Sequence, residues 1–283
     1  MRFLFSLILI CDYYFNKYHH PQYFICCSKI NKKSIIIFMR ILSILILLIL
    51  TGCSISRKAI IQEPAYGKND IYIKHFAYSL VFNSNNKQAD WVAYKLNSYQ
   101  LNKNFKRTNK FIVDKLVPLG TATNADYYKS GYDKGHLAPA ADMTWNKQAM
   151  KESFYLSNIS PQLPDFNRGI WKKLEKHVRE WAKIYDSIYV CTGPIFINTI
   201  KSIGANKVKV PTYFYKTVLI YNDTIKQAIG FILPNKKSKE DIFNYAVSID
   251  SVEQLTKIDM YKALPYLQER KIERDFDIKY FIK

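Results

Sequence analysis

Several short, mainly apolar runs along the chain predict strands. Runs rich in aromatic and β-branched residues, a composition typical of strands, cover residues 78–82, 91–96, 187–196, 213–221 and 227–233. We expect turns at Gly193-Pro194 and Asn222-Asp223. Residues 97–130 are polar and basic and predict a segment that is mostly loop.

A different periodicity predicts one long helix over residues 167–183. Its apolar side chains recur every three or four residues and therefore share one face: Trp171, Leu174, Val178 and Trp181. Asp165 or Asn167 is placed to cap its start. A shorter helical piece is expected at residues 251–256. Since strands and helices mix without a β-α-β rhythm, the sequence predicts an α+β fold with a mainly antiparallel sheet flanked by helices.

The beginning of the chain has a pattern typical of export. Residues 39–53 read MRILSILILLILTGC, with a basic residue, a short apolar run and a Leu-Thr-Gly-Cys ending. The run is too short to span a bilayer, which takes about 20 residues. The ending resembles a bacterial lipobox, so we expect residues 39–52 to be a lipoprotein signal peptide and Cys53 to carry a lipid anchor. Ser54 after that cysteine favours the outer membrane.

Residues 1–38 do not fit this arrangement, because a second apolar run precedes polar and aromatic residues. We interpret Met39 as the true start and residues 1–38 as an over-extended N-terminus. Residues 53–68 would tether a domain of residues 69–283. Only Cys53 and Cys191 remain from that point on, so no internal disulfide is expected, and Cys191 is predicted to be an inert buried thiol.

The charge of the chain favours a polyanionic partner. There are 42 basic and 23 acidic residues, a net charge of +19. Residues 1–52 hold six of the basic and one of the acidic residues, which leaves 36 and 22, a net +14, from Cys53 onward. Nucleic acid, anionic lipid and acidic polysaccharide all match such a surface. A solvated lysine-rich surface would give the same balance.

Missing signatures narrow the chemistry. The sequence has no G-x-S-x-G elbow, no H-E-x-x-H, no paired C-x-x-C and no G-x-x-x-x-G-K-[ST] loop. From Cys53 onward it has only three histidines, His75, His136 and His177. These are too few for a histidine-rich zinc site. A surface or packing role is expected for His75 and His177.

Three short elements single out His136. It ends Asp-Lys-Gly-His at 133–136, with Ala-Pro at 138–139; Asn-x-x-Pro-Gln follows at 158–162, and Asn-x-Gly-x-Trp-x-x-Leu-Glu at 167–175. In order and spacing they resemble the signature of the DNA/RNA non-specific endonucleases of the ββα-metal (His-Me finger) class. The likeness covers about residues 78–264. It implies a ββα-metal finger core and an enzyme that cleaves DNA and RNA without sequence specificity.

The resemblance also implies roles for the motif residues. His136 would be the general base, a task suited to an imidazole whose ordinary pKa is about 6.5. The amide oxygen of Asn167 would hold Mg²⁺ or Mn²⁺, because such ions take oxygen ligands. Glu175, about 80° further round an ideal helix, would hydrogen-bond water around the ion. Arg179 would pair with Glu175 and reach a phosphate.

Three more residues are expected to bind substrate. Arg107 corresponds to an upstream phosphate-contacting arginine of the family, and Asn158 would support the site and contact the substrate. Lys134 replaces the family's usual arginine, which keeps the charge but loses the two parallel donors that clamp a phosphate.

Other interpretations stay open from the residues alone. A basic lipoprotein could bind extracellular nucleic acid or an anionic polymer without cleaving it. A metal-dependent phosphodiesterase for small substrates and a structural envelope lipoprotein are two further alternatives. The net charge of +14 favours a polymer over a small substrate, because only a polyanion offers enough phosphates to contact so many positive charges. Without the resemblance, Glu175 and Arg179 would be an ordinary surface ion pair.

Overall fold

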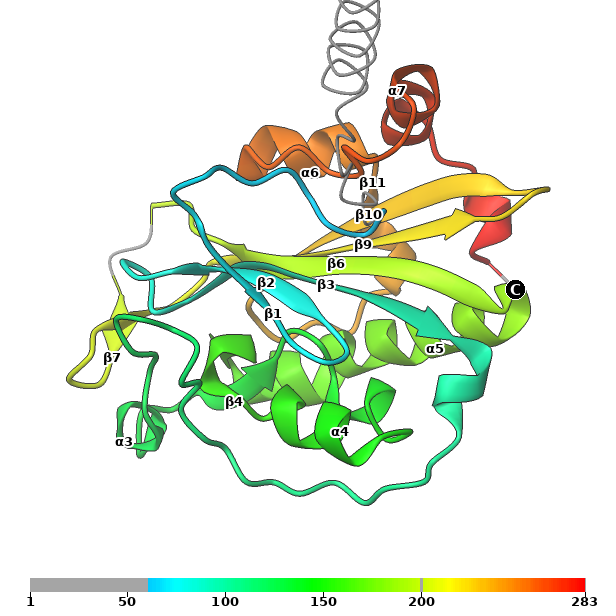
Figure 1. Ribbon diagram of the computed structural model, residues 1–283. Helices are drawn as coiled ribbons and strands as arrows, with labels where there is room; N and C mark the ends of the chain where they lie inside the picture. Colours follow the sequence, from blue (N-terminus) through cyan, green and yellow to red (C-terminus); the bar gives the residue numbers. More distant parts are fainter. Residues whose placement is uncertain (1–60, 199–200, 283) are drawn as a thin grey trace, which may run out of the picture. The chain divides into compact units, whose positions relative to one another are not determined.

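A computed structural model of the chain describes residues 61–198 and 201–282. The predictions for residues 1–38, the signal peptide and the lipid anchor at Cys53 lie outside these residues. The described part is α+β, as the hydrophobic pattern predicts (Figure 1). It contains no helix with the length and apolar character needed to cross a membrane.

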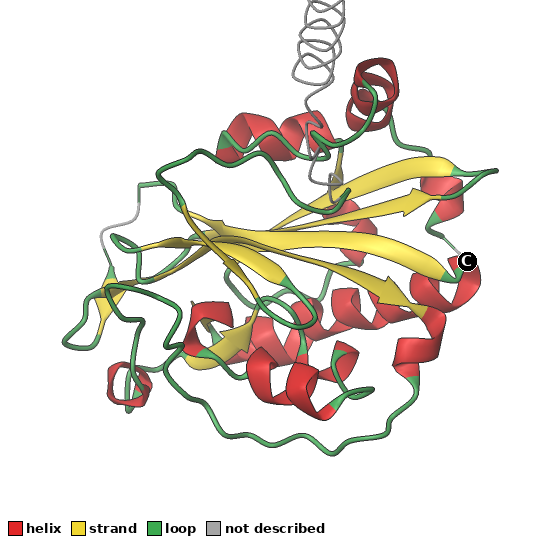
Figure 2. Cartoon of the chain, viewed as in Figure 1, coloured by secondary structure: helices red, strands yellow, loops and turns green. Residues whose placement is uncertain are grey.

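A seven-stranded sheet forms the centre of this domain, and every pairing in it is antiparallel (Figure 2). In spatial order the strands are β1 (Ile71–Lys74), β2 (Ser79–Asn83), β3 (Gln88–Asn97), β6 (Ser187–Ile195), β9 (Tyr213–Tyr221), β10 (Lys226–Pro234) and β11 (Ala246–Val247). Two small ribbons accompany it: β4 (Asp133–His136) with β5 (Ile159–Gln162), and β7 (Ser202–Ile203) with β8 (Val208–Lys209).

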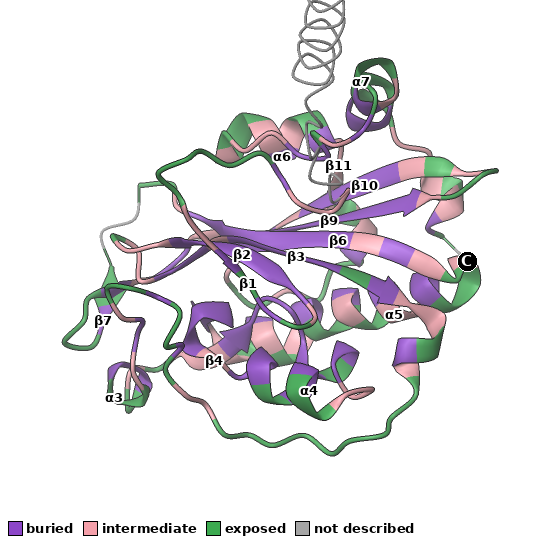
Figure 3. Cartoon of the chain, viewed as in Figure 1, coloured by how far each residue is buried: buried purple, intermediate pink, exposed green. Residues whose placement is uncertain are grey.

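Helices cover the two faces of the sheet. The α-helices are α3 (Asn124–Tyr127), α4 (Lys147–Ser153), α5 (Lys172–Tyr185), α6 (Ile249–Thr256) and α7 (Tyr266–Arg274). The shorter turns are η1 (Ser98–Leu101), η2 (Ala140–Asp142), η3 (Leu156–Asn158), η4 (Phe166–Trp171), η5 (Ile242–Tyr245) and η6 (Ile278–Tyr280). Together they leave the central strands buried along most of their length (Figure 3).

The two faces are distinguished by alternate residues of each strand, as the pleat requires. Val190 of β6 packs with the helix α5 residues Leu174 and Val178 in one core cluster. The next residue, Cys191, packs with Val252 of α6 and Ile272 of α7 in a second cluster. We call these the α5 face and the α6–α7 face.

The strand predictions agree with the structure except at one expected turn. The run 213–221 coincides with β9, and the other four overlap β2, β3, β6 and β10. Gly193-Pro194 is not a turn but part of β6. Beyond Thr192 this strand pairs with β9 alone, so the missing N–H of Pro194 breaks no ladder toward β3.

The predicted helix 167–183 consists of two elements. The π-helical turn η4 precedes α5, and Gly169 between them has φ −99° and ψ −110°, outside the helical range. The four apolar residues of the predicted face are buried, as expected. Asp165 stands at the N-cap position of η4, but its side chain makes no capping hydrogen bond, and Asn167 lies inside η4. The 80° relation of Asn167 to Glu175 also fails, because no continuous helix joins them.

Candidate active site

The β4–β5 ribbon positions His136 at its end. Gly135 pairs with Ser160, and His136 with Ile159. A side chain at position 135 would not fit, because a Cβ there would lie 2.2 Å from the buried side chain of Gln162. The glycine before the histidine is therefore required by close packing within the ribbon.

Asn158 fixes the loop that follows His136. Its Oδ1 accepts a hydrogen bond from the backbone N–H of Ala138 (2.9 Å), and its Nδ2 donates to the carbonyls of Ala138 (2.9 Å) and Ser153 (2.8 Å). The side chain is fully buried. These contacts favour the supporting role expected for Asn158, whereas direct contact with a substrate would require breaking them.

His136 packs against two phenylalanine rings, and one of its ring nitrogens has no hydrogen-bond partner in the described structure. Its ring meets Phe154 edge-on at 4.8 Å and lies 5.5 Å from Phe111. The residue is 7% exposed, and its buried Nε2 has no hydrogen-bond partner in the described structure. Burial, and then the positive charge of Arg107, lower the pKa of His136 to about 3. The imidazole is therefore neutral at physiological pH and able to accept a proton.

The same two phenylalanines hold two predicted phosphate ligands. The guanidinium of Arg107 lies 5.1 Å from the Phe154 ring centre, and its Nε donates to Asn109 (2.6 Å). The Nζ of Lys134 lies 4.7 Å from the Phe111 ring centre and donates to Asn124 (3.0 Å). Arg107 is thus brought to His136 and Lys134, which both lie on β4, although it comes from a distant segment. Sequence reasoning missed Phe111 and Phe154, for which the only signal was an aromatic residue inside a polar loop or before a motif.

Asn167 is oriented by the first residue of β4. Its Nδ2 donates to Oδ2 of Asp133 (2.8 Å), and the same carboxylate accepts two bonds from Arg168 (2.7 and 2.8 Å). Because the amide is planar, fixing its nitrogen also fixes Oδ1, which makes no hydrogen bond in the described residues. Asn167 makes no hydrogen bond there with His136 or Glu175. It is linked to His136 through Asp133, three residues away on the same strand.

The predicted pair of Glu175 and Arg179 is wrong. Arg179 instead donates to Asp142 (3.0 Å), a fully buried carboxylate that also accepts from the Tyr94 hydroxyl (2.8 Å). Glu175 has no ion pair or hydrogen bond among the described residues. Burial raises the pKa of Glu175 to about 7, and Asp142 adds to this increase while Lys216, Arg179 and Arg107 oppose it. Arg179 pairs with Asp142 rather than Glu175 because a fully buried carboxylate needs a charged partner.

Lys216 is a site residue that sequence reasoning did not find. It is fully buried, its Nζ has no hydrogen-bond partner in the described part, and it lies 4.6 Å from the Trp171 ring centre. Burial lowers the pKa of Lys216 to about 8, against the opposing influence of Glu175 and Asp142. A lone lysine within the apolar run 213–221 was the signal for it.

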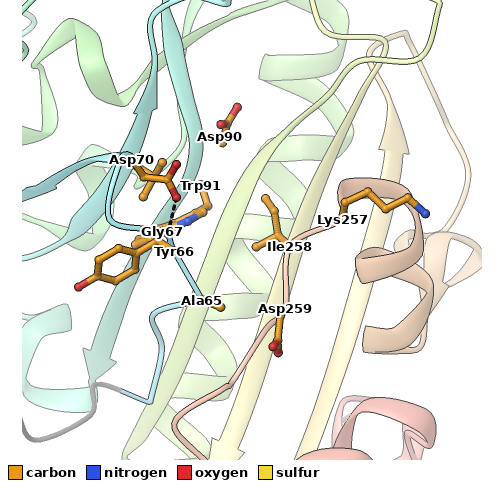
Figure 4. A pocket seen from close by; sticks show the side chains of 10 residues that line it. Ala65, Tyr66, Gly67, Asp70, Asp90, Trp91, Lys257, Ile258 and Asp259 are labelled. Carbon is orange, nitrogen blue, oxygen red and sulfur yellow. Dashed lines mark hydrogen bonds between the residues drawn. The ribbon is translucent and has the colours of Figure 1, made fainter. Parts of the chain in front are cut away.

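A separate hollow lies on the other side of the sheet and contains none of the predicted site residues. It measures about 320 Å³ and is lined by residues before β1, in β2 and β3, and after α6 (Figure 4). Asp90 and Trp91 lie on one wall and Ile258 and Asp259 on the other, while the side chain of Lys257 extends away from it. The candidate site is therefore defined by its side-chain contacts rather than by this hollow.

Several known proteins are similar to this chain in sequence, and one solved structure is similar in fold. The chain is 35% identical to the mitochondrial endonuclease G of Bos taurus over 199 residues, covering 63% of this chain and 64% of that protein. It is 34% identical to nuclease C1 of Cunninghamella echinulata var. echinulata over 224 residues, covering 73% and 89%. A chain in the crystal structure of the EndoG/EndoGI complex superimposes with a TM-score of 0.68 at 31% identity, covering 77% and 95%. The family model for DNA/RNA non-specific endonuclease matches residues 57–267, so this chain belongs to that family.

Proposed function

We propose that this chain hydrolyses phosphodiester bonds in DNA and RNA without sequence preference. The observation that carries the proposal is the buried, unpartnered Nε2 of a neutral His136, held by Phe154 beside the guanidinium of Arg107. Family membership and the net charge of +14 from Cys53 onward support it. The names of the relatives describe nucleases of animals and fungi.

The chain's own residues account for most of the mechanism. His136 accepts a proton from the attacking water, because its imidazole is neutral and its ring cannot rotate away from Phe154 without losing that contact. Arg107 acts on the imidazole, and Lys134, two residues before His136 on β4, adds a second positive charge; together they neutralise the phosphate during attack. Asn158 keeps the loop behind His136 in place.

The donor atoms fit a hard divalent cation, Mg²⁺ or Mn²⁺, at Asn167. The free Oδ1 of Asn167 is a neutral oxygen donor, and Asp133 fixes its direction. Magnesium retains several waters and needs few protein ligands, so one amide oxygen suffices. When bound, such an ion would stabilise the negative charge that develops at the phosphate. Glu175, which has no ion pair of its own, would accept hydrogen bonds from water near the ion.

Digestion of supercoiled DNA and of RNA tests this function. The parent chain should degrade both with Mg²⁺ or Mn²⁺ and neither with EDTA. If the parent binds both nucleic acids but leaves them intact under all conditions, the chain is a binding protein and the proposal is wrong.

The Asn167→Ala variant tests the metal ligand. Loss of the only proposed protein ligand should raise the magnesium concentration needed for half-maximal rate and lower the maximal rate. An unchanged magnesium titration would place the ligand elsewhere.

We also propose that the protein is exported and anchored to the cell envelope through Cys53. The support is the order of basic, apolar and Leu-Thr-Gly-Cys segments in residues 39–53. Mass spectrometry of the mature N-terminus should find a lipidated Cys53, and Cys53→Ala should abolish membrane association. A soluble parent with an unmodified Cys53 would refute the anchor.

A further inference from the structure

The α6–α7 face carries a dense group of carboxylates far from His136. Asp250 and Glu253 lie on α6, and Glu273 on α7; one oxygen from each lies within 4.8 Å of the others. Asp259 and Glu269 form a second such triad with the same Glu273. We call the five residues the acidic cluster. Its members come from positions up to 23 residues apart, so the packing of α7 against α6 creates it.

Two buried carboxylate oxygens of the acidic cluster have no partner. Glu269 and Glu273 are only 6% and 7% exposed, yet the Oε1 of each has no hydrogen-bond partner in the described structure. Buried polar atoms in native proteins are nearly always paired, so two unpaired oxygens in one cluster require an explanation.

No ion pair among the described residues joins the first triad to a cation of the chain. Lys262 pairs with Asp259 at 3.1 Å, and Arg274 pairs with Asp275 at 2.9 Å. Asp250, Glu253 and Glu273 form no ion pair among the described residues; Glu253 accepts a bond from the backbone N–H of Met260 (2.6 Å). Three carboxylates at this spacing repel one another strongly unless a proton or a cation lies between them.

We propose that Asp250, Glu253 and Glu273 bind a calcium ion that ties α6 to α7. An all-oxygen donor set selects a hard cation, and the cluster offers no sulfur or imidazole for a softer one. Calcium accepts six to eight oxygens in irregular geometry, whereas magnesium demands a near-ideal octahedron. The exposed Asp250 leaves room for water to complete the coordination. This site is separate from the cation proposed at Asn167 and does not depend on it.

Thermal unfolding of the metal-stripped full chain tests the site. The Asn167→Ala background removes the other proposed cation ligand, so calcium binding there cannot contribute. Calcium at about 100 times its Kd should raise Tm by about 5–10 °C in this background. Glu273→Gln should lose most of that increase. Asp223→Asn, at an exposed carboxylate in the turn between β9 and β10, should retain it.

Calorimetric titration with calcium gives a second readout that does not depend on unfolding. One ion per chain is expected in the Asn167→Ala background and none after Glu273→Gln, or after Glu253→Gln if the first variant fails to fold. An absence of binding at about 10 mM calcium in the parent would overturn the proposal and leave protons as the compensating charge. The same binding in Glu273→Gln would overturn it too.

Discussion

Buried carboxylates occur on both faces of the sheet, but their neighbours differ in sign. On the α5 face, Asp142 has Arg179 at 3.0 Å, and the charges of Lys216, Arg179 and Arg107 oppose the increase in the pKa of Glu175. On the α6–α7 face, the strongest influences on Glu273 besides burial come from other carboxylates, and the nearby Lys262 pairs with Asp259. The first face has several cations beside its buried carboxylates, whereas Asp250, Glu253 and Glu273 form no ion pair among the described residues.

This difference explains what each face is suited to do. A site that binds a polyanion must carry fixed cations before the substrate arrives, and the α5 face has them in Arg107, Lys134 and Lys216. A cluster that carries only negative charge is suited to a cation and unsuited to nucleic acid. The net charge of the whole chain conceals this division, since +19 describes the sum and not its distribution.

Removal of the base gives the largest expected difference between the faces. His136→Ala should lower the cleavage rate by about 10² to 10⁴-fold, because proton transfer from water loses its acceptor. The calcium-dependent increase in Tm should be unaffected, since the aromatic contacts of His136 are with Phe111 and Phe154 and not with residues of α6 or α7. His177→Ala, at another histidine on the α5 face, is the matched control and should retain activity. An active His136→Ala variant would refute the mechanism.

Lys134 tests whether fixed charge near the base is catalytic. Lys134→Ala should lower the rate by about 10² to 10³-fold, because preorganised charge at a reacting phosphate is lost. Lys134→Arg should retain or raise the rate, since arginine offers two parallel donors. Rates at two salt concentrations separate this role from a general surface charge, which would change mainly the salt dependence. A parent-like rate in Lys134→Ala would remove Lys134 from the site.

Lys216 tests the internal charge balance of the α5 face. Lys216→Met keeps the volume but removes the positive charge that opposes the raised pKa of Glu175. We expect about a tenfold loss of rate at pH 7 and a shift of the acid limb of the pH–rate profile to higher pH. Lys226→Met, at an exposed lysine of β10, should change neither quantity. An unchanged profile in Lys216→Met would mean that Lys216 serves packing alone.

A further expected effect concerns stability in acid. Because the pKa of His136 is lowered to about 3, the unfolded chain binds a proton below about pH 6.5 that the folded chain does not. The folded state should therefore lose stability as pH falls from 6.5 toward 3, by at most about 1.4 kcal/mol per pH unit from this residue. Denaturant unfolding of the parent and of His136→Gln should give curves that diverge below pH 6.5. Parallel curves would show that His136 is not buried in the neutral form.

Local patterns predicted the strands and the family well. The run 213–221 became β9 because its aromatic and β-branched residues fit a sheet buried on both faces. The predicted helix is interrupted at Gly169, whose backbone angles are not helical. The hydrophobic pattern could not predict this, because the identity of a glycine does not determine its backbone angles. The acidic cluster could not be predicted, because its residues meet only after α7 packs on α6. The pairing of Arg179 with Asp142 likewise joins positions 37 residues apart.

The path of the chain through the centre of the sheet has a consequence for folding. Neighbouring strands β3 and β6 pair from Asn97↔Ser187 to Val92↔Thr192, and the backbone N–H of Ser98 donates to the carbonyl of Asp186 (2.7 Å). Every residue assigned to catalysis except Lys216 lies in the long segment between these strands, which contains α4, β4, β5 and α5. Closing so long a loop carries an entropy penalty that grows only slowly with length, but it delays the central pairing until the loop is ordered. Because this segment contains α5, which packs against the sheet, the β-sheet and the active site should form in one cooperative step.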